Sequence, residues 1–274
     1  MWSRSSFAET FAPGAIGMVH LEPLPGSPGW RGDLDRVRAA ALADAAALAE
    51  AGFTALMVEN YQDIPFYPGR VPAETVAAMT RIIGAVRDAH PGRALGVNVL
   101  RNDVESALAV ALATGADCVR VNVHTGAAAT DQGPITGQAW HTLRRRRDLG
   151  CEHIGLLADV RVKHARSLVE RPLEEEAQDL RLRGLADGVI LTGAATGSGA
   201  EAAELVRLRR ALPDCPLLVG SGLTAATVGD FFPLADGCII GSSLKTRGPD
   251  GAPVVDVAKA RDFLQALTAV TKDV

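Results

Sequence analysis

Eight short apolar runs, separated by segments with helical periodicity, constrain the fold of this chain more than any other feature. The runs cover residues 15–21, 55–60, 94–100, 118–123, 154–160, 188–193, 216–222 and 237–242. Each has the length of a strand, and most are rich in Val, Ile or Leu. Strict alternation of strands with helices indicates a parallel sheet, and eight repeats favour closure into a barrel. We therefore predict the α/β class and a single (β/α)8 TIM barrel.

The segments between these runs carry the signals that begin helices. Residues 33–51, 72–90 and 103–114 are amphipathic, and Pro72, Asp103, Pro172 and Thr224 stand where helices are expected to start. No linker rich in Gly, Ser or Pro divides the chain, and its 274 residues are close to the ~250 of a typical barrel of this kind. We predict one domain over residues 1–274, with a short N-terminal extension of about residues 1–13.

The composition limits the kinds of binding partner that can be expected for this chain. The net charge of −4 gives no basic footprint for nucleic acid, so no nucleic-acid partner is expected. No stretch approaches the ~20 apolar residues of a transmembrane helix, and the first ten residues lack the apolar core of a signal peptide. The four cysteines are scattered, without metal-ligand spacing. Buried, reduced thiols in a cytoplasmic protein are the expectation.

Long connections follow three of the expected strands. They cover residues 20–30, 61–71 and 124–137, whereas the segments that return from helix to strand are short. In a (β/α)8 barrel the connections that follow strands lie at the catalytic face. The elaboration of the chain is therefore expected on the one rim that carries the active site in such barrels.

Polar side chains lie near the ends of six expected strands. They are His20 and Glu22, Glu59 and Asn60, Asn98 and Arg101, Arg120 and Asn122, Asp159, and Thr192. Alternate residues of a barrel strand point inward, so polar residues of one parity are expected to face a common pocket. Any one of them has a structural alternative, as a buried group satisfied by hydrogen bonds. Their convergence favours an active site, because burying several charged groups is costly unless they pair or meet a ligand.

Two further hypotheses concern the chemistry of this pocket. Lys163, in the connection after the fifth strand, is a candidate proton donor or Schiff-base lysine, and a solvated or salt-bridged rim lysine is the equally weighted alternative. The carboxylates Glu22, Glu59 and Asp159 raise Mg²⁺ as a minority option, although no metal-specific spacing supports it. No cofactor is otherwise predicted.

Short glycine and serine turns follow the last two strands. Gly220, Ser221 and Gly222 follow the seventh strand, and Gly241, Ser242 and Ser243 follow the eighth. Such turns leave backbone N–H groups uncovered, and many barrels bind phosphate at these two positions. We predict a phosphate site there, with Thr192 and Gly193 lining the neighbouring wall or belonging to a flexible loop.

Several segments resemble the BtpA/SgcQ family. The match runs in order through residues 16–28, 58–60 with 65–72, 96–103, 120–123 with 130–133, 158–160 with 163–164, 192–193 with 196–198, 220–222 and 241–245. It covers nearly the whole chain, although Glu22 stands where proline is common in that family. This departure makes Glu22 a weaker catalytic candidate than Glu59 or Asp159. The resemblance implies a barrel related to the ribulose-phosphate-binding group, and it fixes no reaction.

Three functions are compatible with these features. The favoured hypothesis is an enzyme acting on a sugar phosphate or nucleotide-like metabolite by isomerisation, aldol-type cleavage or removal of a group at the anomeric carbon. Glu59 and Asp159 would be acid and base, with His20 and Lys163 as further catalytic candidates. Asn98 and Asn122 would orient hydroxyls, Arg101 and Arg120 would stabilise negative charge, and Asn60, Thr192 and Gly193 would contact substrate.

The alternatives are not enzymatic. The family includes a member associated with photosystem I biogenesis, which raises an assembly or stability factor for a membrane complex. A sensor that binds a phosphorylated metabolite without converting it is the third possibility. Pairing of barrels through their outer helices makes a homo-oligomer the expected assembly.

Overall fold

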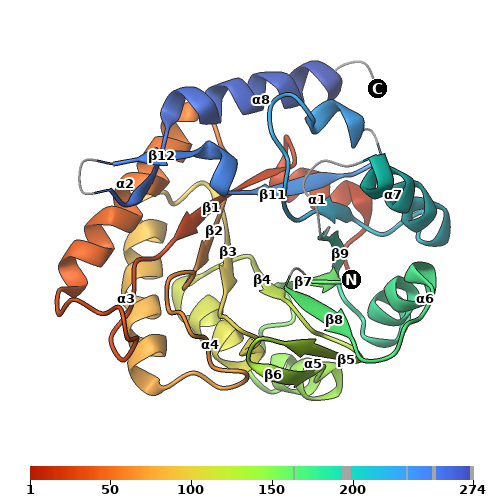
Figure 1. Ribbon diagram of the computed structural model, residues 1–274, viewed down its shortest axis with the longest axis horizontal. Coiled ribbons are helices and arrows are strands. Elements are labelled where there is room, and N and C mark those ends of the chain that lie inside the picture. Colours follow the sequence, from red (N-terminus) through yellow and green to blue (C-terminus); the bar gives the residue numbers. More distant parts are fainter. Residues whose placement is uncertain (163, 193–198, 233, 249–250, 272–274) are drawn as a thin grey trace.

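The centre of the computed structural model is a closed barrel of eight parallel strands (Figure 1). The structure describes residues 1–162, 164–192, 199–232, 234–248 and 251–271. Around the barrel the strands follow the order β1 (Ala15–His20), β2 (Ala55–Glu59), β3 (Ala94–Asn98), β4 (Cys118–Val121), β7 (Gly155–Val160), β9 (Gly188–Leu191), β10 (Leu217–Val219) and β11 (Gly237–Ile240). Pairing of Ala15 with Cys238 closes the ring between β1 and β11. The predicted TIM barrel is confirmed.

All eight predicted strands are present. Each begins within one residue of its expected start, and most end one to three residues earlier than expected. The early ends fall where the chain turns outward into the rim connections. The polar residues that follow the ladders therefore belong to the mouth of the barrel and not to its wall.

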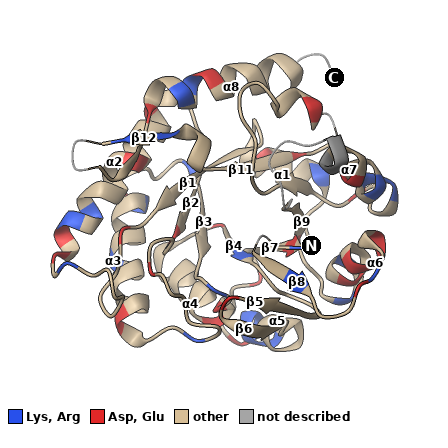
Figure 2. Ribbon diagram, viewed as in Figure 1, with Lys and Arg blue, Asp and Glu red and all other residues tan. Residues whose placement is uncertain are grey.

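Helices surround the barrel on its outside (Figure 1). They are α2 (Leu34–Ala51), α3 (Ala73–Ala89), α4 (Val104–Thr114), α5 (Ala139–Asp148), α6 (Leu173–Gln178), which continues as a π-helix over Asp179–Arg183, α7 (Gly199–Ala211) and α8 (Val257–Thr271). Asp33 and Asp103 cap α2 and α4 by accepting the N–H groups of Arg36 and Ser106. In Figure 2 charges of both signs are spread over these outer helices, so neither sign collects on one face.

The helix expected to begin at Thr224 is absent, and that prediction is wrong. Turns follow β10, and among the described residues between β10 and β11 the only helical turn is a 3-10 helix over Val228–Asp230. The Thr227 hydroxyl accepts the Thr224 N–H, which fixes a local turn. Gly229 and Pro233 then leave no uninterrupted stretch in which an α-helix could propagate.

Two apolar layers hold the barrel together. The larger one packs the outer faces of the strands against the helices, and the smaller one fills the interior of the barrel. Helix α1 (Arg4–Phe11), within the N-terminal extension, contributes Phe7 and Phe11 to the interior layer, and both are fully buried. Phe7 lies against the start of β11 at Gly237, and Trp2 lies against the start of β7 at Gly155. The extension therefore closes the N-terminal end of the barrel.

The rim connections form secondary structure that was not predicted. Strands β5 (Ala127–Thr130), β6 (Gly133–Thr136) and β8 (Ala165–Ser167) make a small antiparallel sheet at the ends of β4 and β7. Strands β12 (Lys245–Arg247) and β13 (Pro253–Val255) form a hairpin after β11. These additions lie at the carboxyl ends of the barrel strands: β5 and β6 fall in the long connection expected after the fourth strand, whereas β8 and the β12–β13 hairpin follow strands for which no long connection was expected.

The cysteines are buried and unpaired, as expected from their spacing. Burial raises the pKa of Cys215 to about 11 and that of Cys238 to about 12, which argues against thiolate chemistry at either. Over the described ranges, no helix combines the length and hydropathy needed to cross a bilayer.

Candidate active site

Seven polar side chains meet at the carboxyl end of the barrel. They are His20, Glu59, Asn98, Arg120, Asn122, Asp159 and Thr192, which we call the axial cluster. Each was predicted from its position at or near a strand end, four of them also from strand parity, and hydrogen bonds or close contacts connect them across neighbouring strands. Glu59, Asn98, Asn122, Asp159 and Thr192 are each at most 6% exposed. Such a concentration of buried polar groups requires partners within the cluster or in a ligand.

Asp159, at the end of β7, is the most heavily hydrogen-bonded member. The guanidinium of Arg120 donates to it twice, from Nε to Oδ2 at 3.0 Å and from NH2 to Oδ1 at 2.8 Å. Asn122 Nδ2 donates to Oδ2 at 2.9 Å, and the Thr192 hydroxyl donates to Oδ1 at 2.5 Å. A carboxylate offers about four acceptor positions, so this set occupies them. Asp159 therefore fixes the orientation of Arg120, Asn122 and Thr192.

The arginines of the mouth carry the positive charge of the site. Burial acts to lower the pKa of Arg120, but the charge and hydrogen bonds of Asp159 outweigh it and raise the pKa. Burial lowers the pKa of Arg101 despite the opposing charges of Asp159, Asp131 and Glu59. Both guanidiniums lie within electrostatic range of Glu59 and Asp159. Their placement suits stabilisation of an anion at the mouth.

Burial shifts the pKa values of Glu59 and His20 in the directions that favour the neutral form of each group. Burial raises the pKa of Glu59 against the lowering effects of Arg120 and of Asn98, whose Nδ2 donates to Oε1 at 2.6 Å. Burial lowers the pKa of His20 to about 3, and the charges of Lys245 and Arg120 add to this effect. Glu59 Oε2 and His20 Nε2 are 3.6 Å apart. Both shifts favour the uncharged species, which weakens any ion-pair character of this contact.

The unpartnered oxygen of Asn122 marks where the cluster is incomplete. Among the described residues, Asn122 Oδ1 is buried without a hydrogen-bond donor, while its Nδ2 is held by Asp159. An unsatisfied buried acceptor costs about 1–3 kcal/mol. A ligand hydroxyl or N–H at the mouth would satisfy it.

The two glycine turns pack directly against the axial cluster. A Cβ built on Gly220 would lie 2.5 Å from Thr192 Oγ1, and one on Gly241 would lie 2.9 Å from His20 Cε1. The turns are tied to each other, because the Ser243 hydroxyl donates to the Leu223 carbonyl at 2.8 Å. The N–H groups of Ser221 and Gly222 have no backbone acceptor within the described part of the chain. The predicted phosphate turns therefore border the cluster and carry free donors.

Four predicted site residues either lie away from the axial cluster or fall outside the described part of the chain. Asn60 points away from the axis, where its amide bonds to the Leu100 backbone and to Asp63. Glu22 pairs with Arg36 at 3.1 Å and does not join the axial cluster, so the three carboxylates suggested for Mg²⁺ do not converge. No three His, Cys, Asp or Glu side chains group as metal ligands in the described residues. Lys163 and Gly193 lie outside the described residues.

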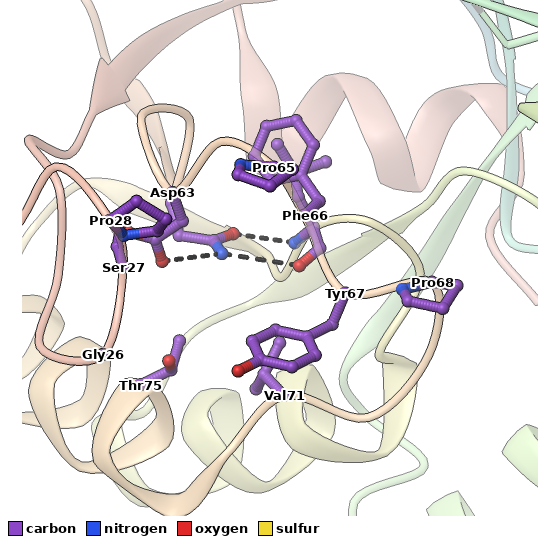
Figure 3. A pocket seen from close by; sticks show the side chains of 12 residues that line it. Gly26, Ser27, Pro28, Asp63, Pro65, Phe66, Tyr67, Pro68, Val71 and Thr75 are labelled. Atoms are coloured by element: carbon purple, nitrogen blue, oxygen red, sulfur yellow. Dashed lines mark hydrogen bonds between the residues drawn. The ribbon is translucent and has the colours of Figure 1, made fainter. Parts of the chain in front are cut away.

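A cavity of about 350 Å³ lies beside the axial cluster and was not predicted. Its walls come from the connections after β1 and β2 and from the start of α3, with Pro28, Asp63, Phe66, Tyr67 and Thr75 among them (Figure 3). Asn60 and Leu100 line it and are adjacent in sequence to Glu59 and Arg101. The cluster of prolines and aromatic residues at 65–68 was the available sequence signal, but strand parity does not reach into connections.

The ring of Tyr61 covers His20. The two rings stack with centroids 4.2 Å apart and an interplanar angle of 18°, and Tyr61 is 44% exposed. Tyr61 thus stands between solvent and the His20–Glu59 contact. Sequence reasoning placed Tyr61 in the long connection after β2 without assigning it a contact.

We expect His20→Gln to weaken the acid sensitivity of folding. The pKa of His20 is lowered to about 3 in the folded chain, whereas an unfolded histidine titrates near 6.5, so the unfolded state binds the additional proton between these values. Stability therefore falls as the pH drops through this window. Urea titrations should show that the wild type loses about 1–2 kcal/mol more than the variant between pH 6.5 and 5. His153→Gln, at an exposed position, is the control; identical pH dependence of wild type and His20→Gln would contradict the burial argument.

Comparison with known proteins gives a consistent family and fold. The family model described as the BtpA family matches residues 13–269. The "Photosystem I biogenesis protein BtpA" of Synechocystis is 43% identical over 252 residues, covering 92% of this chain and 87% of that protein. A protein of Thermococcus kodakarensis is 45% identical, covering 85% of this chain and 87% of its own length.

Solved structures with low sequence identity share the barrel. The structure described as "Native KDPGal structure" has a TM-score of 0.58 at 15% identity and covers 94% of this chain and 96% of its own. The N-(5'-phosphoribosyl)anthranilate isomerase from Pyrococcus furiosus has a TM-score of 0.56 at 13% identity, with coverages of 94% and 99%. At these identities the likeness shows the fold alone.

Proposed function

This chain belongs to the BtpA family, and from the site of this member we propose that it is an enzyme that binds a small phosphorylated metabolite at the carboxyl end of the barrel. The reaction class is acid–base chemistry on a sugar-phosphate-like or nucleotide-like substrate. The observation that carries the proposal is the pair of opposed carboxyl environments. Glu59 is buried beside a neutral imidazole, while Asp159 is the ion-pair partner of Arg120.

Glu59 is the proposed proton donor. Its raised pKa keeps it protonated closer to neutral pH than a free carboxyl, which is the requirement for a general acid. The neutral His20 contributes a hydrogen-bonding imidazole 3.6 Å away. Placing an acid and an uncharged imidazole together gives the mouth a group that can donate a proton and one that can hold the reacting oxygen or nitrogen.

In the proposed site Asp159 is the anionic group and Arg120 is the cationic group. The two hydrogen bonds between them hold the guanidinium in one orientation. In this proposal Arg120 and Arg101 stabilise negative charge that develops on the substrate, and Asn98 and Asn122 contact its hydroxyls. An acid–base role of Asp159 itself, as predicted from its position, requires a ligand to displace one of its four donors.

The turns after β10 and β11 are the proposed phosphate grip. Free N–H groups at Ser221 and Gly222 support it, together with the contact of Gly241 with His20, which brings the turn to the acid–base pair. The phosphate would then anchor the substrate while its reacting end lies over β1 and β2. Solved structures of the same fold include phosphoribosyl anthranilate isomerases, whose substrate carries a phosphoryl group by name.

Binding of inorganic phosphate and ribose 5-phosphate tests the grip directly. Ser242→Glu introduces a negative charge into the turn after β11, and we expect at least about tenfold weaker binding of both ligands by calorimetry, equal to about 1.4 kcal/mol. Ser5→Glu, on α1 at the closed end of the barrel, makes the same change in net charge and serves as the matched control. Equal affinities in the two variants would rule out the turn as the phosphate site.

Two non-enzymatic functions remain to be separated from this proposal. An assembly factor draws on the name of the Synechocystis relative. A sensor would bind the phosphorylated ligand through the same turns without using Glu59 as an acid. Turnover that depends on Glu59 distinguishes the enzyme from both.

A further inference from the structure

The cavity beside the axial cluster has flat apolar walls. The connections line it with the rings of Pro28, Pro65 and Pro68, and Phe66 and Tyr67 add aromatic rings. In Figure 3 the Tyr67 ring lies on one side of the cavity and Asp63 on the other. A volume of about 350 Å³ is at the lower end of the range for small-molecule sites. Flat aromatic walls favour a planar ring, which stacks on them with little dependence on its substituents.

Polar groups stand at the edges of this apolar space. Asp63 Oδ1 accepts the Leu24 N–H at 2.7 Å and Oδ2 accepts from Asn60 Nδ2 at 3.1 Å, which leaves further acceptor positions on each oxygen. Thr75 lines the cavity near Tyr67, and both carry hydroxyl groups (Figure 3). Asp63 is half-buried, and burial raises the pKa of its carboxyl. Groups that accept and donate at the edge of a flat space suit a heteroaromatic ring and not a plain hydrocarbon ring.

The order of strands indicates how far β2, whose connection lines the cavity, lies from β11, which precedes a glycine turn. Strands β10, β11, β1 and β2 are consecutive in the barrel. Neighbouring strands lie about 4.8 Å apart, so β2 is about 10 Å from β11. His20 at the end of β1 and Glu59 at the end of β2 stand on the two strands that follow β11 in the barrel order, and the cavity is lined by the connections that follow the same two strands. A molecule with a phosphate in that turn and a ring in the cavity would pass over both residues.

We propose that the cavity is a subsite for a planar heteroaromatic ring, so that the substrate belongs to the nucleoside-monophosphate class: a nitrogen-containing ring joined through a pentose to a phosphate. This inference rests on the proposed function for the phosphate end only. The ring subsite itself is defined by Asp63, Phe66, Tyr67 and Thr75, which take no part in the axial cluster. The linkage between ring and pentose then lies over Glu59 and His20.

Calorimetry with adenosine 5'-monophosphate, uridine 5'-monophosphate, adenosine and ribose 5-phosphate tests the subsite. At least one of the two nucleotides should bind about tenfold or more tightly than ribose 5-phosphate, because stacking of one base has an effect of that size. Tyr67→Ala should remove this advantage and leave ribose 5-phosphate binding unchanged. Trp140→Ala, which deletes an aromatic ring that is 64% exposed on α5, should leave every affinity unchanged.

The outcomes separate this inference from the phosphate proposal. Nucleotides that bind no more tightly than ribose 5-phosphate overturn the ring subsite while the phosphate grip stands. Adenosine binding that is lost in Tyr67→Ala supports the ring subsite even where ribose 5-phosphate and inorganic phosphate fail to bind, which would refute the phosphate grip. Nucleotide binding that is unaffected by Tyr67→Ala and by Asp63→Asn places the ring elsewhere and overturns the inference.

Discussion

Glu59→Gln is expected to lower kcat/KM by about 10²–10⁴-fold on a phosphorylated substrate that the wild type converts. The substitution preserves the shape of the side chain and an acceptor for Asn98 Nδ2, which donates to Glu59 Oε1 at 2.6 Å. It removes the transferable proton. Since the loss is confined to the chemical step, KM should change little, whereas loss of a substrate contact alone would raise KM with kcat preserved.

The pH profile supplies an independent measurement of the same residue. Burial raises the pKa of Glu59, and a general acid is active in its protonated form. The wild-type kcat/KM should therefore decline as the pH rises through that raised pKa, and this limb should be missing from the residual activity of Glu59→Gln. Glu9→Gln on α1, at the closed end of the barrel, controls for a lost carboxyl. Unchanged turnover in Glu59→Gln would refute the acid role.

Arg120→Met is expected to reduce the free energy of unfolding by about 3–5 kcal/mol. The side chain of Asp159 has no exposed surface, and Arg120 supplies two of its four hydrogen bonds. Removing the guanidinium leaves a buried carboxylate without its countercharge. Urea unfolding near pH 7 measures the loss.

A double variant separates the charge from the packing. Arg120→Met with Asp159→Leu removes both charges, and it should recover part of the stability because no uncompensated ion remains. Arg183→Met removes an arginine that is 83% exposed and 3.9 Å from Asp179, and it should change stability by less than about 0.5 kcal/mol. A single Arg120→Met variant as stable as Arg183→Met would show that the pair contributes little.

Position at a strand end, together with parity for His20, Asn98, Arg120 and Asn122, predicted the membership of the axial cluster because both rules depend only on local geometry. Arg120 and Asn122 share a face of β4 and its extension, and both reach Asp159 on the neighbouring strand. Parity also explains why Asn60 lies outside the axial cluster: it follows Glu59 directly and therefore takes the opposite face of the strand. Glu22 lies beyond the end of β1, where alternation no longer holds, and Arg36 of α2 captures it.

Strand parity could not predict which side chains hydrogen-bond to each other or how the rim connections fold. The four donors on Asp159 come from β4 and β9 or their ends, and their convergence on β7 depends on the tilt and register of the closed barrel. The sheet of β5, β6 and β8 pairs residues from two connections that are more than thirty positions apart. The helix expected at Thr224 failed because a threonine start signal says nothing about the residues that must continue the helix. The cavity at Tyr67 depends on connections in the same way.

Helix α1 determines how protons reach the candidate acid. Phe7 and Phe11 fill the N-terminal end of the barrel with apolar side chains, and no described polar group of that layer leads toward Glu59. We therefore expect the Glu59 proton to exchange with solvent at the opposite end, where the rings of Tyr61 and His20 stack. A substrate seated over these rings would isolate the acid from bulk water until product leaves. The N-terminal extension, remote from the reacting groups, thus closes one end of the barrel, and the mouth is the end at which we expect protons to enter.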